Sequence, residues 1–329
     1  AKLGFVSHSP ANQIVTDKVW HELALGLESL GYKTPEIRGR VAEMAAFFGI
    51  DGWFRKSVAE LSGGQKQLLN LAAVMTLQPD VLILDEPTSR LDPIAAGEFL
   101  NVLKKMNSEL GVAVILTEHR LEEALPLADK VAVMEGGELV CTGTPREVGS
   151  RLKAVNSGMF LAMPTAMRIW SALDGDEPCP LTVAEGRNFL HRSAETRAIS
   201  AVPKRHIPEP ENEVAVSISE AWFRYEKDGE DVIRGLDLTV HKGEFLTILG
   251  GNGAGKTTTL KLISGLRKAY RGEIRVNGKI AALPQDQQTL FAKKTVREEI
   301  SECADSLPPE VRESRSAYIS AICRLGDLL

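Results

Sequence analysis

The chain has 329 residues, of which 43% are apolar and 25% are charged, and its formal net charge at pH 7 is −5. This composition is typical of a globular protein and excludes the disordered, collagen-like and coiled-coil classes. The acidic balance lacks the basic footprint of nucleic-acid-binding proteins, so we expect no nucleic acid as a partner. The length allows two domains.

The four cysteines, Cys141, Cys179, Cys303 and Cys323, show no metal-ligand spacing, which favours free thiols in a reducing compartment such as the cytoplasm. No window approaches the ~18 consecutive apolar residues of a membrane-spanning helix, so we expect any membrane role to depend on a partner. The chain begins with Ala1 inside a motif, which suggests a piece of a longer protein.

Residues 16–60 are predicted to form a small helical subdomain, because Ile37, Val41, Met44 and Phe48 fall on one helical face. The segment LSGGQKQ (61–67) follows it directly.

LSGGQKQ is predicted to form an anion site at the start of a helix. Ser62 can cap that helix, and Gly63 and Gly64 can expose their backbone N–H groups to an anion. A simple helix cap is the alternative, but it would not need the Gly-Gly-Gln sequence that includes Gln65.

The next elements are strand, helix and strand. VLILDEP (81–87) is an apolar run that ends in two carboxylates, residues 94–111 have helical spacing, and VAVIL (112–116) is a second β-branched run. This order predicts a parallel sheet with a crossover helix.

The acidic pair after the first of these strands can bind a metal ion and activate a water molecule. Asp85 can hold Mg²⁺ through water, and Glu86 can polarise an attacking water. A plain helix-cap role is the alternative for such a pair. His119 follows the second strand, at the edge that faces the ligand crevice, where we expect a γ-phosphate contact rather than a structural role. Asp92 is either a turn residue or a contact across a dimer.

Residues 130–144 are predicted to form a hairpin that turns at Gly136-Gly137 and closes the first unit near residue 150. Residues 151–212 contain several prolines, mixed charges and short apolar clusters, so we expect a partly ordered linker there. From about residue 213 the pattern changes to strands.

The segment 250–257 fits the phosphate-binding pattern G-x-x-x-x-G-K-[ST], between a predicted strand (244–249) and a helical pattern. Its glycines let N–H groups converge on the β- and γ-phosphates, Lys256 supplies a point charge, and Thr257 can bind Mg²⁺. Upstream, Tyr225 is placed where it could stack on a purine, although a half-buried strand tyrosine is the alternative.

The phosphate loop comes late because the chain repeats itself. Two segments resemble each other, FVSHSPANQIVTDKVWHELALGL (5–27) and ALPQDQQTLFAKKTVREEI (282–300). In this comparison Val19 corresponds to Val296 and His8 to Gln285, at an offset of 277 residues (296 minus 19). This indicates a duplication with the period of a whole domain.

Together these motifs resemble the nucleotide-binding subunits of ATP-binding cassette (ABC) transporters. They are similar to the family's A-loop, Walker A, Q-loop, signature, Walker B, D-loop and H-loop, carried here by Tyr225, residues 250–258, Gln285, LSGGQ, VLILDEP, SRLD (89–92) and His119. NQIVTDKVWHELALGLESLG and LSGGQKQ further resemble the energy-coupling factor (ECF) ATPases, which drive uptake of vitamins and metal ions, in their tandem form.

The resemblance implies an α/β fold of the P-loop NTPase type, with a parallel core sheet, an antiparallel β subdomain and a helical subdomain. It implies ATP and Mg²⁺ as cofactors, and a place at the cytoplasmic face of the membrane beside transmembrane transporter subunits. The residues that it assigns are Tyr225, Gly250, Asn252, Gly253, Gly255, Lys256, Thr257, Thr258, Gln285, Ser62, Gly63, Gly64, Gln65 and Asp92 for ATP, Asp85, Thr257 and Gln285 for Mg²⁺, and Glu86 and His119 for catalysis.

The repeat and the order of the motifs divide the chain into two parts. We expect residues 1–150 to be the C-terminal part of a first cassette and residues 213–329 to be the N-terminal part of a second. In this family two cassettes bind ATP head to tail. The second cassette's Walker A then faces Ser62–Gln65, and we expect this chain alone to bind ATP weakly and not to hydrolyse it efficiently. His8 stands where the family has the Q-loop glutamine, which predicts two unequal sites.

Two alternatives remain. One is a non-transport tandem ATPase of the translation or repair type, which would favour a long basic linker. The other is a circularly permuted single nucleotide-binding domain, in which residues 213–329 and 1–150 complement each other and Lys256 and Glu86 share one site.

Overall fold

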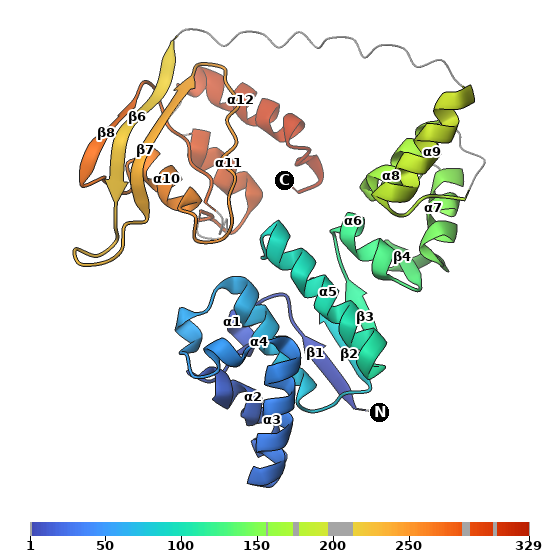
Figure 1. The fold of residues 1–329 in the computed structure, drawn as a ribbon. Coiled ribbons are helices and arrows are strands. Elements are labelled where there is room, and N and C mark those ends of the chain that lie inside the picture. The colour runs from blue at the N-terminus through green and yellow to red at the C-terminus, as the bar shows by residue number, and fades with distance from the viewer. Residues whose placement is uncertain are drawn as a thin grey trace. The chain divides into compact units, whose positions relative to one another are not determined.

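The computed structural model describes residues 2–155, 157–173, 178–196, 213–284, 290–304 and 308–328. They fall into two compact units (Figure 1). The first unit comprises Ala1–Pro208 with the short segment Leu249–Ala254, and the second comprises Glu209–Ile248 and Gly255–Leu329. Among the described helices, none is both long and apolar enough to span a membrane.

A parallel sheet forms the centre of the first unit, in the order β1 (Leu3–Val6), β2 (Val81–Asp85), β3 (Ala113–Thr117). Helix α5 (Pro93–Leu110) connects β2 to β3, as the strand-helix-strand pattern predicted. Parallel neighbours need such a crossover because each strand must start from the same end of the sheet. Leu82 and Leu84 on β2 are fully buried, which anchors the strand that carries Asp85.

The helical subdomain contains α1 (Pro10–Gln13), α2 (Val19–Ser29) and α3 (Thr34–Phe48), which pack against α4 (Gly63–Met75). Short 3-10 turns at Asp51–Trp53 and Val58–Glu60 lead from α3 to α4. The predicted apolar face of α3 is confirmed, since Val41, Met44 and Phe48 are buried and Ile37 packs against the same core.

The predicted hairpin is also present, as β4 (Val131–Glu135) and β5 (Glu138–Gly143). Its two turn residues, Gly136 and Gly137, have φ values of 59° and 85°. Positive φ at both central residues is the requirement of a type I′ turn, which explains the two glycines.

Residues beyond the hairpin are more ordered than a linker. The turns α6 (Leu121–Ala124) and Leu125–Leu127 precede it, and α7 (Pro145–Ala154), a 3-10 turn at Gly158–Ala162, α8 (Thr165–Ala172) and α9 (Val183–Thr196) follow it. Met163, Met167 and Trp170 are buried with Cys179 and Phe189 in one cluster. The described residues 151–155, 157–173 and 178–196 are therefore largely helical and contribute apolar side chains to this core, so they are more ordered than the linker that we predicted.

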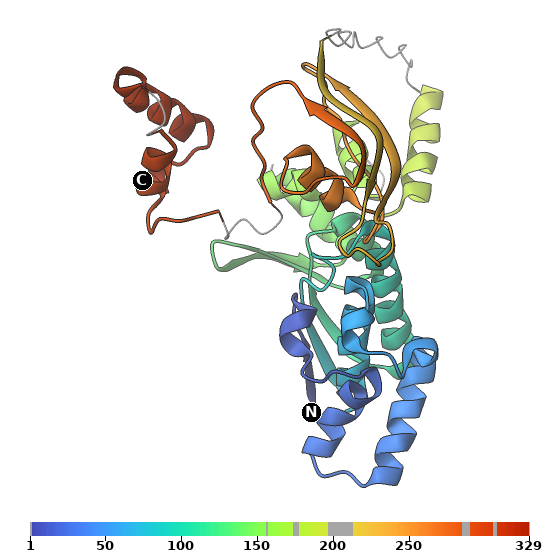
Figure 2. The ribbon, with the colours of Figure 1, turned by 90° about the vertical axis from the view of Figure 1, so that its left-hand side faces the viewer.

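The second unit has an antiparallel sheet in the order β7 (Ile233–His241), β6 (Val214–Phe223), β8 (Arg271–Val276). The sheet curves around α10 (Lys256–Ile263), as Figures 1 and 2 show. Phe223, Ile233 and Leu262 form its core. The helices α11 (Val296–Ala304) and α12 (Pro309–Ile322) and a last turn at Gly326–Leu328 complete the unit.

The predicted strand at 244–249 is not formed, and that prediction was wrong. Residues 244–250 have no regular structure, and Phe245 is 95% exposed. A strand exists only through hydrogen bonds to a neighbour. The described sheet of the second unit, β7-β6-β8, offers none to this segment.

The sequence repeat has a structural counterpart. In the helical subdomain, Glu22 Oε2 accepts hydrogen bonds from the N–H groups of Val15 and Thr16 at 3.1 and 2.8 Å. Glu299 Oε2 accepts the corresponding bonds from Ala292 and Lys293, also at 3.1 and 2.8 Å. All three pairs of residues are 277 apart (299 minus 22), and α2 and α11 begin at the equivalent residues Val19 and Val296.

Candidate functional site

The carboxyl ends of the parallel strands bring three predicted residues together. Asp85 is the last residue of β2, Glu86 follows it, and His119 comes two residues after Thr117 ends β3. Asp85 and Thr117 are paired in the register of the two strands. The carboxyl edge of an open parallel sheet is the usual place for a ligand.

Glu86 and His119 contact each other directly. His119 Nε2 lies 2.7 Å from Glu86 Oε1, within hydrogen-bond distance. The side chain of His119 is 81% exposed and that of Glu86 is 39% exposed. Both side chains therefore remain accessible to a water molecule and to a phosphate group, while each limits the orientation of the other.

Thr117 fixes the acidic pair, and sequence reasoning missed it. Its Oγ1 donates to Asp85 Oδ1 at 2.9 Å and accepts from the N–H of Glu86 at 3.0 Å. Its carbonyl oxygen also accepts from that N–H, at 3.2 Å. The sequence did hold one sign of this role, since Thr117 is the last residue of β3, the strand next to the one that carries Asp85.

The backbone of Glu86 is strained. Its φ is 44°, in the left-handed region that non-glycine residues rarely adopt. Such a conformation costs about 1–3 kcal/mol and persists where surrounding contacts impose it, often at functional sites. Here the N–H of Glu86 is held by its two bonds to Thr117.

Asp92 caps α5. Its Oδ1 accepts from the N–H groups of Ile94 and Ala95 at 3.1 and 3.0 Å. The turn role considered for this residue is therefore present, and the dimer contact stays a prediction.

The signature segment forms the predicted cap of α4. Ser62 Oγ accepts from the N–H of Gln65 at 3.3 Å, and Gln65 Oε1 accepts from the N–H of Ser62 at 2.9 Å. This reciprocal pair is a capping box. A Cβ on Gly64 would lie 3.1 Å from Ala95 Cβ, so the glycine allows a close approach to α5, whereas Gly63 faces open space.

Two further residues of α4 were missed. Gln67 is fully buried and donates from Nε2 to the carbonyl of Ser7 at 3.1 Å. Asn70 donates from Nδ2 to the carbonyl of Pro10 at 3.4 Å. These bonds fix the loop after β1, in which His8 is exposed at the same sheet edge as Glu86.

The phosphate-loop motif leads into α10, as predicted. Gly253 and Gly255 have φ values of 83° and 87°. Lys256 is half-buried and Thr257 is exposed at the start of the helix, while Gly250 and Asn252 lie exposed in the preceding loop. Gln285 lies outside the described residues.

Thr258 and Tyr225 form a pair. Thr258 is 5% exposed, and its Oγ1 lies 3.1 Å from the hydroxyl of Tyr225. The Tyr225 ring is 52% exposed, and Arg267 lies over it at 5.8 Å. Phe223 also contacts the ring edge to face, at 5.0 Å between the centroids. The purine contact stays a prediction.

The expected Mg²⁺ ligands fit a phosphate-bound ion better than a protein cage. No group of three or more His, Cys, Asp or Glu side chains in the described part of the chain could hold a metal. Mg²⁺ usually keeps several waters and binds one or two carboxylates together with substrate phosphates. The exposed carboxylate of Asp85 and the exposed hydroxyl of Thr257 suit that mode of binding.

The comparisons with known proteins show the family of the chain. The profile of the ABC transporter family matches residues 2–89 and 233–326, more than half of the chain. The chain belongs to the ABC transporter family. Its α/β fold, with a parallel sheet, antiparallel sheets and helices, is that of an ABC ATP-binding subunit.

The relatives carry the same family name. A putative ABC transporter ATP-binding protein of Bacillus thuringiensis subsp. konkukian is 42% identical over 281 residues, which are 85% of this chain and 50% of that protein. One of Streptomyces coelicolor is 32% identical over 363 residues, covering 97% of this chain and 63% of that protein. This chain thus spans about half the length of the first of these relatives.

A solved structure is also similar. It is cbiO1 from Clostridium perfringens, described as part of the ABC transporter complex cbiONQ, and it is 32% identical with a TM-score of 0.44, over 51% of this chain and 66% of that chain.

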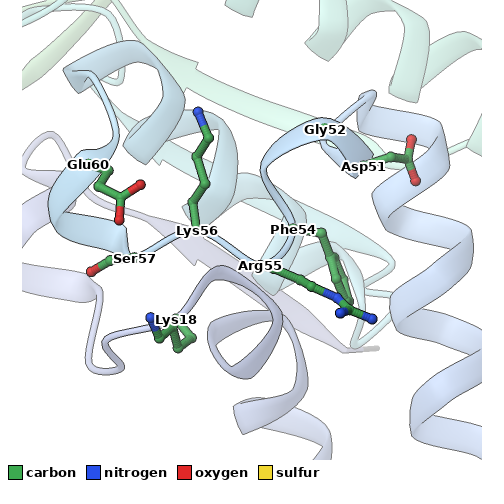
Figure 3. Close-up of a pocket in the computed structure, with 8 residues that line it drawn as sticks. All are labelled: Lys18, Asp51, Gly52, Phe54, Arg55, Lys56, Ser57 and Glu60. Atoms are coloured by element: carbon green, nitrogen blue, oxygen red, sulfur yellow. The ribbon is translucent and has the colours of Figure 1, made fainter.

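A surface pocket of this ABC protein is lined by none of the predicted site residues (Figure 3). The segment before the signature pairs with the start of α2, since the N–H groups of Val19 and Trp20 bind the carbonyls of Lys56 and Phe54 at 3.3 and 3.1 Å. The pocket above this pairing has a volume of about 480 Å³. It is lined by Lys18, Asp51, Gly52, Phe54, Arg55, Lys56, Ser57 and Glu60.

Proposed function

We propose that this chain is part of the ATP-hydrolysing subunit of an ABC importer. The observation that carries the proposal is the contact between Glu86 and His119 at the carboxyl edge of the parallel sheet, next to an acidic residue suited to Mg²⁺. Family membership adds ATP as the nucleotide.

In the proposed reaction a water molecule attacks the γ-phosphate of ATP. Glu86 orients that water and accepts its proton, and its strained backbone and its bond to His119 restrict the carboxylate to a narrow range of positions. His119 can donate to a γ-phosphate oxygen or to Glu86, depending on its tautomer. Bound Mg²⁺ would neutralise charge on the β- and γ-phosphates, and Asp85, oriented by Thr117, would hold it through water.

Lys256 and the N–H groups at the start of α10 would bind the phosphates of ATP. Ser62 to Gln65 would contact the nucleotide from the opposite side in a head-to-tail pair of cassettes. We assign residues 1–150 to the first cassette and 213–329 to the second, and the two separate matches to the family profile support this division.

The ECF-type importer is the finer part of the proposal, with a vitamin or a metal ion as the transported solute. It is supported by the resemblance of NQIVTDKVWHELALGLESLG and LSGGQKQ to ECF ATPases. Transmembrane subunits would then be the partners, and the protein would bind the cytoplasmic face of the membrane. A gene for a multispanning protein next to this one would support transport over the translation or repair alternative.

The test is the number of ATP molecules bound by the natural gene product that contains this chain. Hydrolysis is avoided by using a non-hydrolysable ATP analogue, and the bound analogue is counted by equilibrium dialysis. Two tandem cassettes predict two ATP per protein and one after Lys256→Ala. A permuted single domain predicts one ATP and none after the same substitution.

Hydrolysis is measured on the protein with Glu86 intact. We expect Mg²⁺-dependent release of phosphate, and Glu86→Gln should lower the turnover of the site that contains Glu86 by about 100-fold or more, within the usual range for a lost general base. A wild-type protein that binds no ATP, or a Glu86→Gln variant with unchanged turnover, would contradict the proposal.

A further inference from the structure

Glu118, next to His119, connects two turns of the site. Its Oε1 accepts from the N–H of Thr88 at 3.2 Å and also from the Thr88 hydroxyl. Its Oε2 accepts from the N–H groups of His119 and Arg120, at 2.9 and 3.2 Å. One carboxylate thus holds the turn that follows β2 and the turn that follows β3.

The contact between Glu118 and Thr88 holds the chain after Glu86, whereas Thr117 binds Glu86 itself. Thr117 fixes the N–H of Glu86, whereas Glu118 fixes Thr88, two residues further along the same turn. Thr88 is fully buried, so its N–H has no ready replacement in solvent if the carboxylate is removed. Arg120 adds a third connection, because its Nη2 donates to the carbonyl of Leu91 at 3.1 Å.

We propose that Glu118 is a positioning residue for ATP hydrolysis. It touches neither of the reacting groups, but through Thr88 and the N–H of His119 it sets the distance between Glu86 and His119. Hydrogen bonds to a charged acceptor are the strong ones, and this carboxylate accepts four of them from the two turns. The inference rests on the proposed ATPase function.

The strained backbone of Glu86 explains why such a connection is needed. A residue at a φ of 44° returns to an ordinary conformation unless the chain on both sides is held. Thr117 holds the side before Glu86 and Glu118 holds the side after it. Without Glu118, the Glu86 carboxylate and the His119 ring would each sample a wider range of positions, and a displacement of about 1 Å can cost 100-fold in rate.

Two substitutions separate positioning from loss of fold. Glu118→Ala removes both acceptor oxygens and with them all four hydrogen bonds. Glu118→Gln keeps one oxygen for the N–H groups of His119 and Arg120, and its NH₂ group can donate to the Thr88 hydroxyl, so only the bond from the Thr88 N–H is lost. Glu109→Ala is the matched control, since Glu109 is an exposed glutamate at the end of α5.

The first measurement is hydrogen exchange of residues 1–329. We expect Glu118→Ala to speed exchange of the Thr88, His119 and Arg120 amides by about 10-fold or more, since their acceptor is gone. Glu118→Gln should speed mainly Thr88, and Glu109→Ala should change none of the three. Unchanged exchange at Thr88 and His119 in Glu118→Ala would overturn the proposal.

The second measurement is steady-state ATP hydrolysis by the natural gene product. At the site that contains Glu86, we expect Glu118→Ala to lower kcat about 10- to 100-fold and to leave KM for ATP within about 2-fold of the wild-type value, because no phosphate-binding residue is changed. Glu118→Gln should recover most of the rate. A rise in KM that accounts for the loss, or a Glu118→Gln variant as slow as Glu118→Ala, would overturn the role in positioning.

The two measurements also separate this inference from the function on which it rests. A wild-type protein without Mg²⁺-dependent hydrolysis would overturn the proposed function and any catalytic role of Glu118. Faster exchange in Glu118→Ala together with normal kcat would retain the ATPase and overturn only the positioning role.

Discussion

The substitution Gly255→Ala tests the geometry of the phosphate loop. Gly255 is buried, has a φ of 87° and precedes α10 directly. A Cβ added there would lie 2.8 Å from Ile233 Cδ1 and 3.1 Å from the carbonyl oxygen of Val232. The new methyl group would therefore meet both a core side chain and a backbone atom.

The expected cost has two parts. The left-handed backbone costs about 1–2 kcal/mol for any residue with a Cβ. Crowding adds about 1–3 kcal/mol, because Ile233 belongs to the core of the second unit and cannot move away freely. Gly265→Ala isolates the first part, since Gly265 has a φ of 73° and no atom within 4 Å of the added Cβ.

Both variants can be compared by native-state hydrogen exchange of the β6 and β7 amides and by titration with a fluorescent ATP analogue. We expect Gly255→Ala to lower the opening free energy by about 2–5 kcal/mol and Gly265→Ala by about 1–2 kcal/mol. ATP affinity should fall about 10-fold or more in Gly255→Ala only, because the loop N–H groups no longer converge on the phosphates. Equal effects of the two substitutions on stability, or wild-type ATP affinity in Gly255→Ala, would refute this reasoning.

Three further outcomes are expected. Ser62→Ala should destabilise the start of α4 by about 1 kcal/mol, seen as faster exchange there, because the Gln65 N–H loses its acceptor; an unchanged rate would contradict the cap. Glu22→Ala should destabilise α2 by about 2–4 kcal/mol, because Glu22 is only 6% exposed and its two N–H donors lose their acceptor. Glu299→Ala should destabilise α11 by less, because Glu299 is half-buried and water can replace more of its bonds. Glu22→Gln keeps an acceptor and should recover most of the lost stability. Burial raises the pKa of Cys179 to about 11, so the unfolded thiol loses its proton first and the stability of the first unit should fall as pH rises from about 9 to 11, a slope that Cys179→Ala should remove.

The elements that the sequence predicted well have local causes. The apolar face of α3, the two glycines of the hairpin and the cap of α4 each depend on residues within a few positions of one another. The strand at 244–249 was predicted from its apolar run, but its formation depends on a neighbouring strand that no local pattern can supply. The helices of 151–196 were missed because prolines and mixed charges concealed the spacing of Met163, Met167 and Trp170, which pack together.

In the candidate site, too, some residues were predictable from local patterns and others depend on contacts between distant segments. Asp85, Glu86 and His119 were found because they end strands or follow them, and parallel strands end at one edge. The residues that hold them, Thr117 and Glu118, act through contacts between segments about 30 residues apart, which carry no motif of their own. Motifs therefore predicted the candidate reacting groups, and the structure was needed to find the contacts that hold them in place.

The repeated helical subdomain helps to distinguish tandem cassettes from a single permuted cassette. A single permuted cassette needs one such subdomain, placed once between its Q-loop and its signature. This chain contains the same carboxylate contact twice, from Glu22 to the N–H of Thr16 and from Glu299 to the N–H of Lys293, each at the start of an equivalent helix. Both copies also continue into a second helix with proline in its first turn, Pro35 in α3 and Pro309 in α12. A permuted domain has no use for the second copy, whereas tandem cassettes require it, so this repeat supports our proposal of two cassettes.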